Sequence, residues 1–229
     1  MKHIDTSMKK LTILGFYPQR LNLLMELGYD SNGYETFDVL QNIGVKEELS
    51  DYVENTYFDV RFHETYLEEK FDSFQKSSFA FGVIGIKSKE MVFDYFKKFN
   101  IKKTQFPNLI HPSCVISNSV ELNKGIQIES LCSITVLAKI GFGVNIKRNS
   151  AIGHHCVIND YVTINPGAII SSFVKIGKNT LIGTGVVIKD KISIGENTII
   201  GSGSNVTKDI PSNSIAYGNP CVVHRINKV

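Results

Sequence analysis

An aliphatic residue recurs at every sixth position along the second half of this chain. This series, here called the bulky lattice, consists of Ile110, Ile116, Leu122, Ile128, Ile134, Ile140, Ile146, Ile152, Ile158, Ile164, Ile170, Ile176, Ile182, Ile188, Ile194, Ile200 and Val206. A period of six does not fit the 3.6-residue period of an α-helix, and it is too regular for ordinary strands and turns. The pattern therefore predicts a repeat architecture.

A second series, the compact lattice, follows four residues after each bulky position. Its mostly small or β-branched members are Cys114, Val120, Ile126, Cys132, Ala138, Val144, Ser150, Cys156, Val162, Ala168, Val174, Thr180, Val186, Ile192, Thr198, Ser204 and Ile210. Glycine and asparagine, which tolerate tight corners, recur between the two lattices. Three such hexads make one triangular coil, and stacked coils bury a continuous column of side chains. Residues 110–210 thus predict between five and six coils of a parallel β-helix.

The first hundred residues follow a different pattern. The stretch Leu11–Phe16 predicts a buried strand, and Gln19–Leu27 a short helix that ends at Gly28. Ser78–Ile86 is strongly β-forming, and Lys89–Phe99 predicts a helix with an apolar face. Alternating strands and helices favour a small α/β domain with a parallel, Rossmann-like sheet.

The expected domains are residues 1–107, an α/β domain expected to bind the acceptor substrate, and residues 108–229, the β-helix. Thr104–His111 would link them. The part of the chain between the two predicted strand–helix units gives no clear pattern.

Composition bounds the functional classes. The chain of 229 residues is 42% hydrophobic and 21% charged, with a net charge of +3. This balance argues against nucleic acid or a membrane surface as partner. Neither an apolar stretch of about 18 residues nor a signal peptide is recognisable, so we expect no membrane insertion.

The positions of the cysteines predict that they pack in the core rather than form disulfides or bind a metal. Cys114, Cys132 and Cys156 occupy the compact lattice, and Cys221 lies outside it without a partner motif. Buried free cysteines behave as small hydrophobic residues. We therefore expect reduced thiols, no metal site, and a reducing compartment, most simply the cytoplasm.

Two readings of the N-terminal domain remain open. The turn after the first strand begins Gly15-Phe16-Tyr17 and lacks the G-x-G-x-x-G sequence that lets a backbone approach a pyrophosphate. The second strand ends in a turn at Gly85. In one interpretation, the carboxyl ends of these strands form a ligand-binding crevice. In the other, the domain is a lid or interaction domain without a phosphate loop.

Two adjacent histidines carry the clearest candidate chemistry. In the hexad Ile152–Val157, His154 is placed outside the coil, so it is either a solvated surface residue or a functional base. His155, with Asp160 and Thr163 from the following hexads, would supply an orienting neighbour and a polar lining. Alternation along the strand predicts that the two histidines point to different faces, which argues against a zinc site.

Residues 152–188 resemble the bacterial hexapeptide acetyltransferases of the sialic-acid O-acetyltransferase type. That group includes N-acetyltransferases acting on UDP-linked 4-amino sugars in bacillosamine-type pathways and on GDP-perosamine. Phe79–Lys98, Asn108–Pro112 and Tyr217–Pro220 also resemble segments of this family. The resemblance implies a left-handed β-helix, acetyl-CoA as acyl donor, and a homotrimer with sites between subunits.

The resemblance also implies roles for particular residues. The general base of the family falls on His154; the usual acidic neighbour is replaced here by His155, which we count with the catalytic residues. The implied acetyl-CoA contacts are Thr163, Gly183, Thr184 and Ser202. The implied nucleotide-sugar contacts are Gly15, Phe16, Tyr17 and Gly85.

Three functions fit these observations. The first is acetyl transfer from acetyl-CoA to an amino group of a nucleotide-linked sugar, for surface polysaccharide or glycan synthesis. The second is O-acetylation of a sugar or sialic acid, and the third is a non-catalytic β-helix scaffold. The outward histidine and the glycine-rich corners favour an enzyme over a scaffold.

Overall fold

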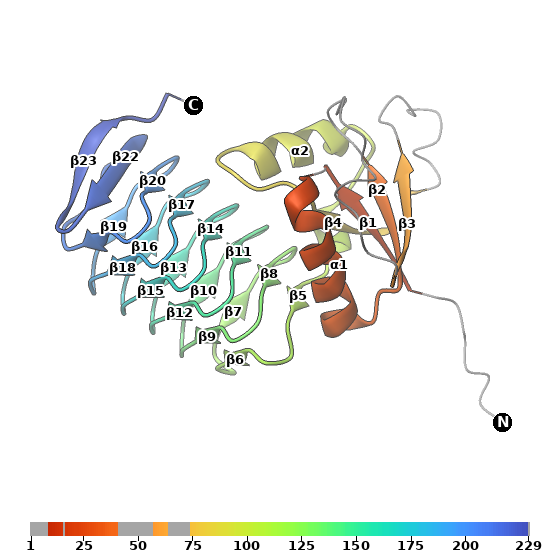
Figure 1. The fold of residues 1–229 in the computed structure, drawn as a ribbon, viewed down its shortest axis with the longest axis horizontal. Helices are drawn as coiled ribbons and strands as arrows, with labels where there is room; N and C mark the ends of the chain where they lie inside the picture. The colour runs from red at the N-terminus through yellow and green to blue at the C-terminus, as the bar shows by residue number, and fades with distance from the viewer. Residues whose placement is uncertain (1–8, 16, 41–56, 64–73, 229) are drawn as a thin grey trace.

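The computed structural model describes residues 9–15, 17–40, 57–63 and 74–228, which form a small α/β part beside a long β-helix (Figure 1). A four-stranded sheet of order β3-β2-β1-β4 forms the first part, and all of its strands are parallel. Its strands are β1 (Lys10–Leu14), β2 (Thr36–Leu40), β3 (Asp59–His63) and β4 (Ser78–Phe81). The sequence pattern predicted β1 and β4 and missed β2 and β3.

Two helices cover opposite faces of this sheet. Helix α1 (Pro18–Asn32) packs on the face of Leu11 and Ile13, and α2 (Ser88–Lys97) on the face of Leu14. The predicted end of α1 at Gly28 is wrong, because the helix continues to Asn32.

Glycine geometry explains that error. A Cβ on Gly28 would lie 3.3 Å from the ring of Phe37, so this glycine permits close packing rather than ending the helix. Gly33, with φ of 70°, provides the left-handed C-cap.

The strand expected over Ser78–Ile86 is also shorter than predicted. It ends at Phe81 because Gly82 meets the turn after β1: a Cβ on Gly82 would lie 2.2 Å from the Gly15 carbonyl oxygen. Only glycine allows this approach, which brings the carboxyl ends of β1 and β4 together. A short 3-10 helix, η3 (Lys103–Gln105), follows α2.

The β-helix is confirmed, and each bulky-lattice residue ends a two-residue strand. The strands are β5 (Leu109–Ile110), β6 (Val115–Ile116), β7 (Glu121–Leu122), β8 (Gln127–Ile128), β9 (Ser133–Ile134), β10 (Lys139–Ile140), β11 (Asn145–Ile146), β12 (Ala151–Ile152), β13 (Val157–Ile158), β14 (Thr163–Ile164), β15 (Ile169–Ile170), β16 (Lys175–Ile176), β17 (Leu181–Ile182), β18 (Val187–Ile188), β19 (Ser193–Ile194), β20 (Ile199–Ile200) and β21 (Asn205–Val206). The first of these strands lies inside the segment predicted as a linker.

From β5 to β18, each strand pairs in parallel with the strand three hexads later, as Ile146 does with Ile164. The prism therefore has three faces. Face 1 is the eight-stranded sheet that includes β8, β11, β14, β17 and β20; face 2 is the six-stranded sheet from β6 to β21; face 3 is the five-stranded sheet from β7 to β19. Seventeen strands at three per coil give between five and six coils, as predicted.

Both lattices point into the prism. From Ile126 to Ile210 all their members are buried, whereas those of the first coil are partly covered. Compact-lattice thiols and hydroxyls bond to backbone carbonyls: Cys132 Sγ donates to Lys147 O (3.2 Å) and Thr180 Oγ1 to Gly195 O (2.7 Å). The cysteines are free, and burial raises the pKa of the Cys132 thiol to about 12.

An aromatic cluster joins the two parts. Phe81 from β4 and Phe93 from α2 contact Phe142 of the β-helix, with ring centroids 5.8 and 5.2 Å apart. Phe106 and Tyr161 belong to the same buried cluster. The α/β part is thereby fixed against face 1 of the prism.

At the far end, β22 (Ser214–Gly218) extends face 1 and pairs antiparallel with β23 (Cys221–Ile226), which closes the helix. Among the helices that the structure describes, none is both long and apolar enough to span a membrane.

Candidate active site

His154 and His155 form the corner between β12 on face 2 and β13 on face 3. Their Nδ1 atoms lie 3.0 Å apart, and His155 has a φ of 57°. The prediction that the two rings point to different faces is therefore wrong. Strand alternation does not apply at a corner, where the left-handed conformation turns His155 back towards its neighbour.

Phe173 occupies the same corner one coil further along. Its ring stacks on His155 at 4.9 Å and 22°, and it meets His154 edge-on at 5.0 Å. The Phe173 N–H donates to His154 O at 2.9 Å. The aromatic ring therefore fixes both imidazoles. Sequence analysis did not single out Phe173, although its position three hexads after His155 could have identified it.

Asp160 and Thr163 do not line this corner. Asp160 Oδ1 accepts the Phe142 N–H (2.7 Å) at the next corner of the coil, between faces 3 and 1. Thr163 lies on face 1, only 2% exposed, and its Oγ1 accepts from Lys89 Nζ at 3.1 Å. The predicted polar lining of the histidines is thus not formed by these residues.

Glycines whose Cα atoms face open space form a column along the corner between faces 1 and 2. Gly167, Gly185 and Gly203 stack there at φ of 66–69°, and a Cβ on any of them would meet nothing within 4 Å. Thr184 and Ser202 are exposed on the same column. Strands stack about 4.8 Å apart, so this line of bare corners runs lengthwise along the prism; it is called the glycine groove below.

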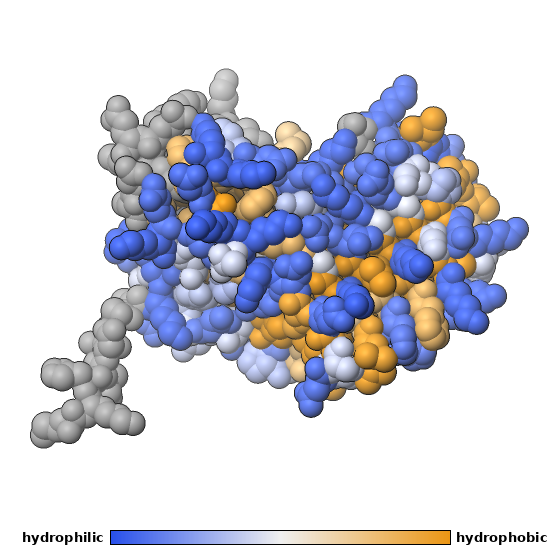
Figure 2. Space-filling model, turned by 180° about the vertical axis from the view of Figure 1, so that it is seen from behind, coloured by the Kyte–Doolittle hydropathy of each residue, from blue (hydrophilic) through white to orange (hydrophobic). Residues whose placement is uncertain are grey.

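The histidine corner and the glycine groove stand at the two edges of face 2. Within one chain, therefore, Thr184 and Ser202 are not brought together with His154. Between them, face 2 exposes Val115, Ile169 and Val187, which are 72%, 48% and 40% accessible. Figure 2 shows apolar side chains gathered in a band along the β-helix.

The carboxyl edge of the four-stranded sheet brings together the other predicted residues. Gly15 (φ 74°) follows β1, Gly85 (φ 114°) lies beyond β4, and Tyr17 caps α1 with 44% of its surface exposed. Because β1 and β4 are neighbours, these turns are adjacent. Phe16 lies outside the described residues.

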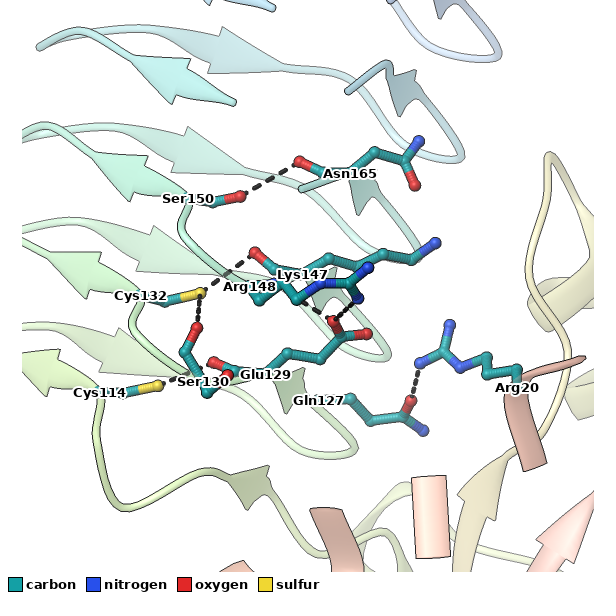
Figure 3. A network of polar contacts seen from close by, with 10 residues as sticks. All are labelled: Arg20, Cys114, Gln127, Glu129, Ser130, Cys132, Lys147, Arg148, Ser150 and Asn165. Atoms are coloured by element: carbon teal, nitrogen blue, oxygen red, sulfur yellow. Dashed lines mark hydrogen bonds and ion pairs between the residues drawn. The ribbon is translucent and has the colours of Figure 1, made fainter. Parts of the chain in front are cut away.

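A polar network that sequence analysis missed fills the space between this edge and face 1 (Figure 3). Arg20 from α1 donates to Gln127 Oε1, and Gln127 Nε2 donates to Phe81 O at 3.0 Å. With its amide oxygen turned towards Arg20, Asn145 accepts two further hydrogen bonds from the guanidinium, at 2.8 and 3.0 Å. Burial lowers the pKa of Arg20 to about 10.

Further cations surround Arg20. Lys89 is fully buried and also donates to Val162 O at 3.1 Å. Its pKa is held well below the usual value, chiefly by burial and also by the positive charges of Arg20 and Lys147. Burial and Arg20 also lower the pKa of Lys147. Glu129 is the carboxylate that interacts with Arg20 and Lys147, and it accepts from Arg148 Nη1 at 3.2 Å. Gln127, Asn145 and Thr163 are spaced eighteen residues apart, which is three hexads, and therefore stack on face 1. A search of the sequence for polar residues at this spacing could have predicted this polar strip.

Comparison with known families identifies the repeats. Residues 173–208 match the model described as bacterial transferase hexapeptide (six repeats). The repeats in these residues are therefore similar to those of hexapeptide transferases. The match lies in the glycine-rich coils that carry Thr184 and Ser202.

Solved structures share the fold of nearly the whole chain. The acetyltransferase domain of PglB from Neisseria gonorrhoeae, in complex with acetyl coenzyme A, is 21% identical, with a TM-score of 0.79 over 95% of this chain and 100% of that one. A mutant of perosamine N-acetyltransferase from Caulobacter crescentus, in complex with CoA and GDP-perosamine, is 18% identical (TM-score 0.76; 95% and 97% covered). WeeI from Acinetobacter baumannii is 23% identical (TM-score 0.72; 95% and 100% covered).

The described part of the chain contains no group of side chains that could hold a metal ion. No three histidine, cysteine or carboxylate side chains converge there, although His154 and His155 meet each other.

Proposed function

We propose that this protein transfers an acetyl group from acetyl-CoA to an amino group of a nucleotide-linked sugar. One observation carries the proposal: a paired histidine and an open glycine groove stand at the two edges of one apolar face. The fold shared with acetyltransferase structures, at a TM-score of up to 0.80, supports it.

The glycine groove suits the donor. Pantetheine is a long, thin chain, and the bare Cα atoms of Gly167, Gly185 and Gly203 leave room for it along the prism. Thr184 and Ser202 would border it, with Gly183 beneath them. We do not place Thr163 in this groove, because it is buried under Lys89.

A homotrimer would complete the site. If face 2 packs around a threefold axis parallel to the prism, its apolar side chains are buried and the edges of neighbouring prisms meet. The His154 corner of one subunit then faces the glycine groove of the next. Threefold symmetry keeps equal coils level, so His154 lies opposite Arg148, which belongs to the same coil.

From the coil of Arg148, the groove continues along the prism towards the C-terminal end of the β-helix. Thr184 and Ser202 lie two and three coils above Arg148, about 10 and 14 Å at the usual strand spacing. This run matches an extended pantetheine with its thioester near His154 and its nucleotide end near Ser202.

His154 would act as general base. Its Nδ1 faces His155, which leaves Nε2 free to take a proton from the acceptor amine as the nitrogen attacks the thioester carbonyl carbon. The new C–N bond forms, the C–S bond breaks, and the protonated ring returns its proton to the leaving thiolate. The products are an amide and free CoA, without a covalent enzyme intermediate.

The α/β part would hold the acceptor. Its strand order, 3-2-1-4, is that of half a Rossmann-like sheet, in which ligands bind at the carboxyl ends of the strands. Gly15, Phe16, Tyr17 and Gly85 are assigned to that edge. Residues 1–107 would thus serve as the acceptor domain and residues 108–229 as the left-handed β-helical transferase domain. Free thiols and a CoA donor favour the cytoplasm.

Release of free CoA from acetyl-CoA tests the proposal directly. UDP-, GDP- and dTDP-linked amino sugars would be compared with their deaminated parents and with sialic acid. Acceptor-dependent release with an amino sugar, giving a product with an amide, is expected. Turnover of sialic acid alone would instead establish O-acetylation, and no turnover of any acceptor would favour a scaffold.

A further inference from the structure

The space between α1 and face 1 carries an excess of positive charge. Arg20, Lys89 and Lys147 interact with one another there, and Arg148 lies at the edge. Glu129, only 4% exposed, is the carboxylate that the structure places among them. Figure 3 shows Lys147 reaching out from the coil towards the side from which Arg20 approaches. The cluster therefore has at least two cations more than its carboxylate can balance.

Two of these cations have donor atoms without an acceptor within the described residues. Arg20, 6% exposed, leaves its Nε without a hydrogen bond, although its terminal nitrogens bond to Gln127 and Asn145. The described side chains and carbonyls likewise offer no acceptor to Lys147 Nζ, although its side chain is partly buried. Burying unpaired positive charge costs free energy, which a bound anion would recover.

We propose that Lys147 and Arg20 bind an anionic group of the acceptor sugar, either a phosphate or a carboxylate. This inference rests on the proposed acetyl transfer and names the part of the acceptor that the chain recognises. Lys89, held by Val162 O and Thr163 Oγ1, lies next to these two cations and is not itself proposed as a ligand of the anion.

The position of the cluster favours the acceptor over the donor. Lys147 belongs to the same coil as His154, so it lies at the level where the acceptor nucleophile must approach the thioester. The phosphates of CoA would lie several coils higher, near Ser202. An anion at Lys147 therefore belongs to the molecule that receives the acetyl group.

The cluster also accounts for the missing phosphate loop. Counted from Gly15 in the first turn, Tyr17 and Arg20 stand where the G-x-G-x-x-G sequence has its second and third glycines, so the backbone of this turn cannot cradle a phosphate in the usual way. Arg20 follows that turn immediately and is aimed at face 1. Side-chain cations from α1 and the β-helix would thus replace backbone amides as the phosphate or carboxylate ligands.

Calorimetric titration of the full-length protein with inorganic pyrophosphate and with N-acetylneuraminic acid tests this site. Lys147→Gln should weaken binding of the recognised anion about tenfold or more, the usual effect of losing a charged hydrogen bond. Lys147→Arg should retain most of the binding. Lys175→Gln, which removes the same charge from an exposed position on face 3, should leave it unchanged.

The two probes identify the source of the anion. Lys147-dependent binding of pyrophosphate indicates a nucleotide-linked acceptor, and Lys147-dependent binding of the sugar acid indicates a carboxylate. Equal binding by wild type and Lys147→Gln overturns the inference, as does the absence of binding by either probe. Competition between CoA and pyrophosphate also overturns it, because the site would then serve the donor.

Kinetics separate this inference from the proposed function. A raised acceptor KM with a nearly unchanged kcat in Lys147→Gln supports the anion site. An active enzyme whose acceptor KM is unaffected by the change overturns the site and leaves the acetyltransferase standing. Lys147-dependent anion binding without acetylation of any sugar supports the site and overturns the proposed function.

Discussion

The Nδ1 atoms of His154 and His155 lie 3.0 Å apart, so one proton must lie between the two rings. If His154 donates it, His154 keeps an unprotonated Nε2 facing outwards, as a base requires. His155 then acts as the acceptor that fixes this tautomer, with Phe173 stacked on it. A neutral ring can thus orient the base without supplying the negative charge of a carboxylate.

Replacement of His154 by alanine should lower kcat by about 10²–10⁴-fold, the usual contribution of a positioned base. Affinity for CoA should change little, because the groove lies on the other edge of face 2. Steady-state kinetics and CoA titration measure the two effects. His224→Ala, at an exposed position in the closing hairpin, is the control. Near-normal turnover by His154→Ala would exclude the proposed base.

His155 should act on the pH dependence more than on the chemistry. His155→Ala should reduce kcat less than His154→Ala does. His155→Asp places an anion beside the protonated form of His154 and stabilises it, so the acid limb of the pH–rate profile should move to higher pH. Initial rates between pH 5 and 9 measure the shift. A larger loss in His155→Ala than in His154→Ala contradicts these roles.

Two isoleucines from adjacent strands should respond differently to charge. Ile164 is fully buried between Ile146 and Ile182, so Ile164→Asp should cost about 4 kcal/mol or more and prevent folding. Ile169 is 48% exposed on face 2, so Ile169→Asp should leave a folded chain that no longer forms trimers. Circular dichroism and sedimentation distinguish these results. A native trimer of Ile164→Asp would refute the placement of the bulky lattice inside the prism. An active monomer of Ile169→Asp would refute an active site shared between subunits.

Lys89 should make stability depend on pH. Burial, Arg20 and Lys147 hold its pKa well below the value of 10.5 expected in the unfolded chain. Between these two pKa values the unfolded state binds a proton that the folded state does not, so the free energy of unfolding should rise with pH. Urea denaturation at pH 7 and 9 should show a larger rise for wild type than for Lys89→Met. Parallel curves would contradict this assignment.

The periodicity of the sequence predicted the β-helix because each hexad repeats one local environment. Ile152 and Cys156 could therefore be placed inside the prism without knowledge of their distant neighbours. The same reasoning failed at His155, where a left-handed corner replaced strand alternation. Gly28 and Gly82 misled for a related reason: their role is set by close approach to Phe37 and Gly15, which are distant in sequence.

The polar network could not be predicted from local pattern. Arg20 meets Gln127, and Lys89 meets Thr163, only because an aromatic cluster docks the α/β part on face 1. Strands β2 and β3 were missed because the chain on either side of them offers no comparable periodicity. Contacts between segments about a hundred residues apart depend on tertiary packing, which a single sequence does not encode in any short motif.

Mixed trimers test the central claim, that each active site combines the His154 corner of one subunit with the glycine groove of the next. His154→Ala removes the base, and Thr184→Trp fills the groove, so each variant alone should be an inactive trimer. Refolding them together in equal amounts should restore about a quarter of the sites, those with an intact corner facing an intact groove. Acceptor-dependent CoA release is the readout. If the mixture remains inactive although mixed trimers form, the site does not lie between subunits.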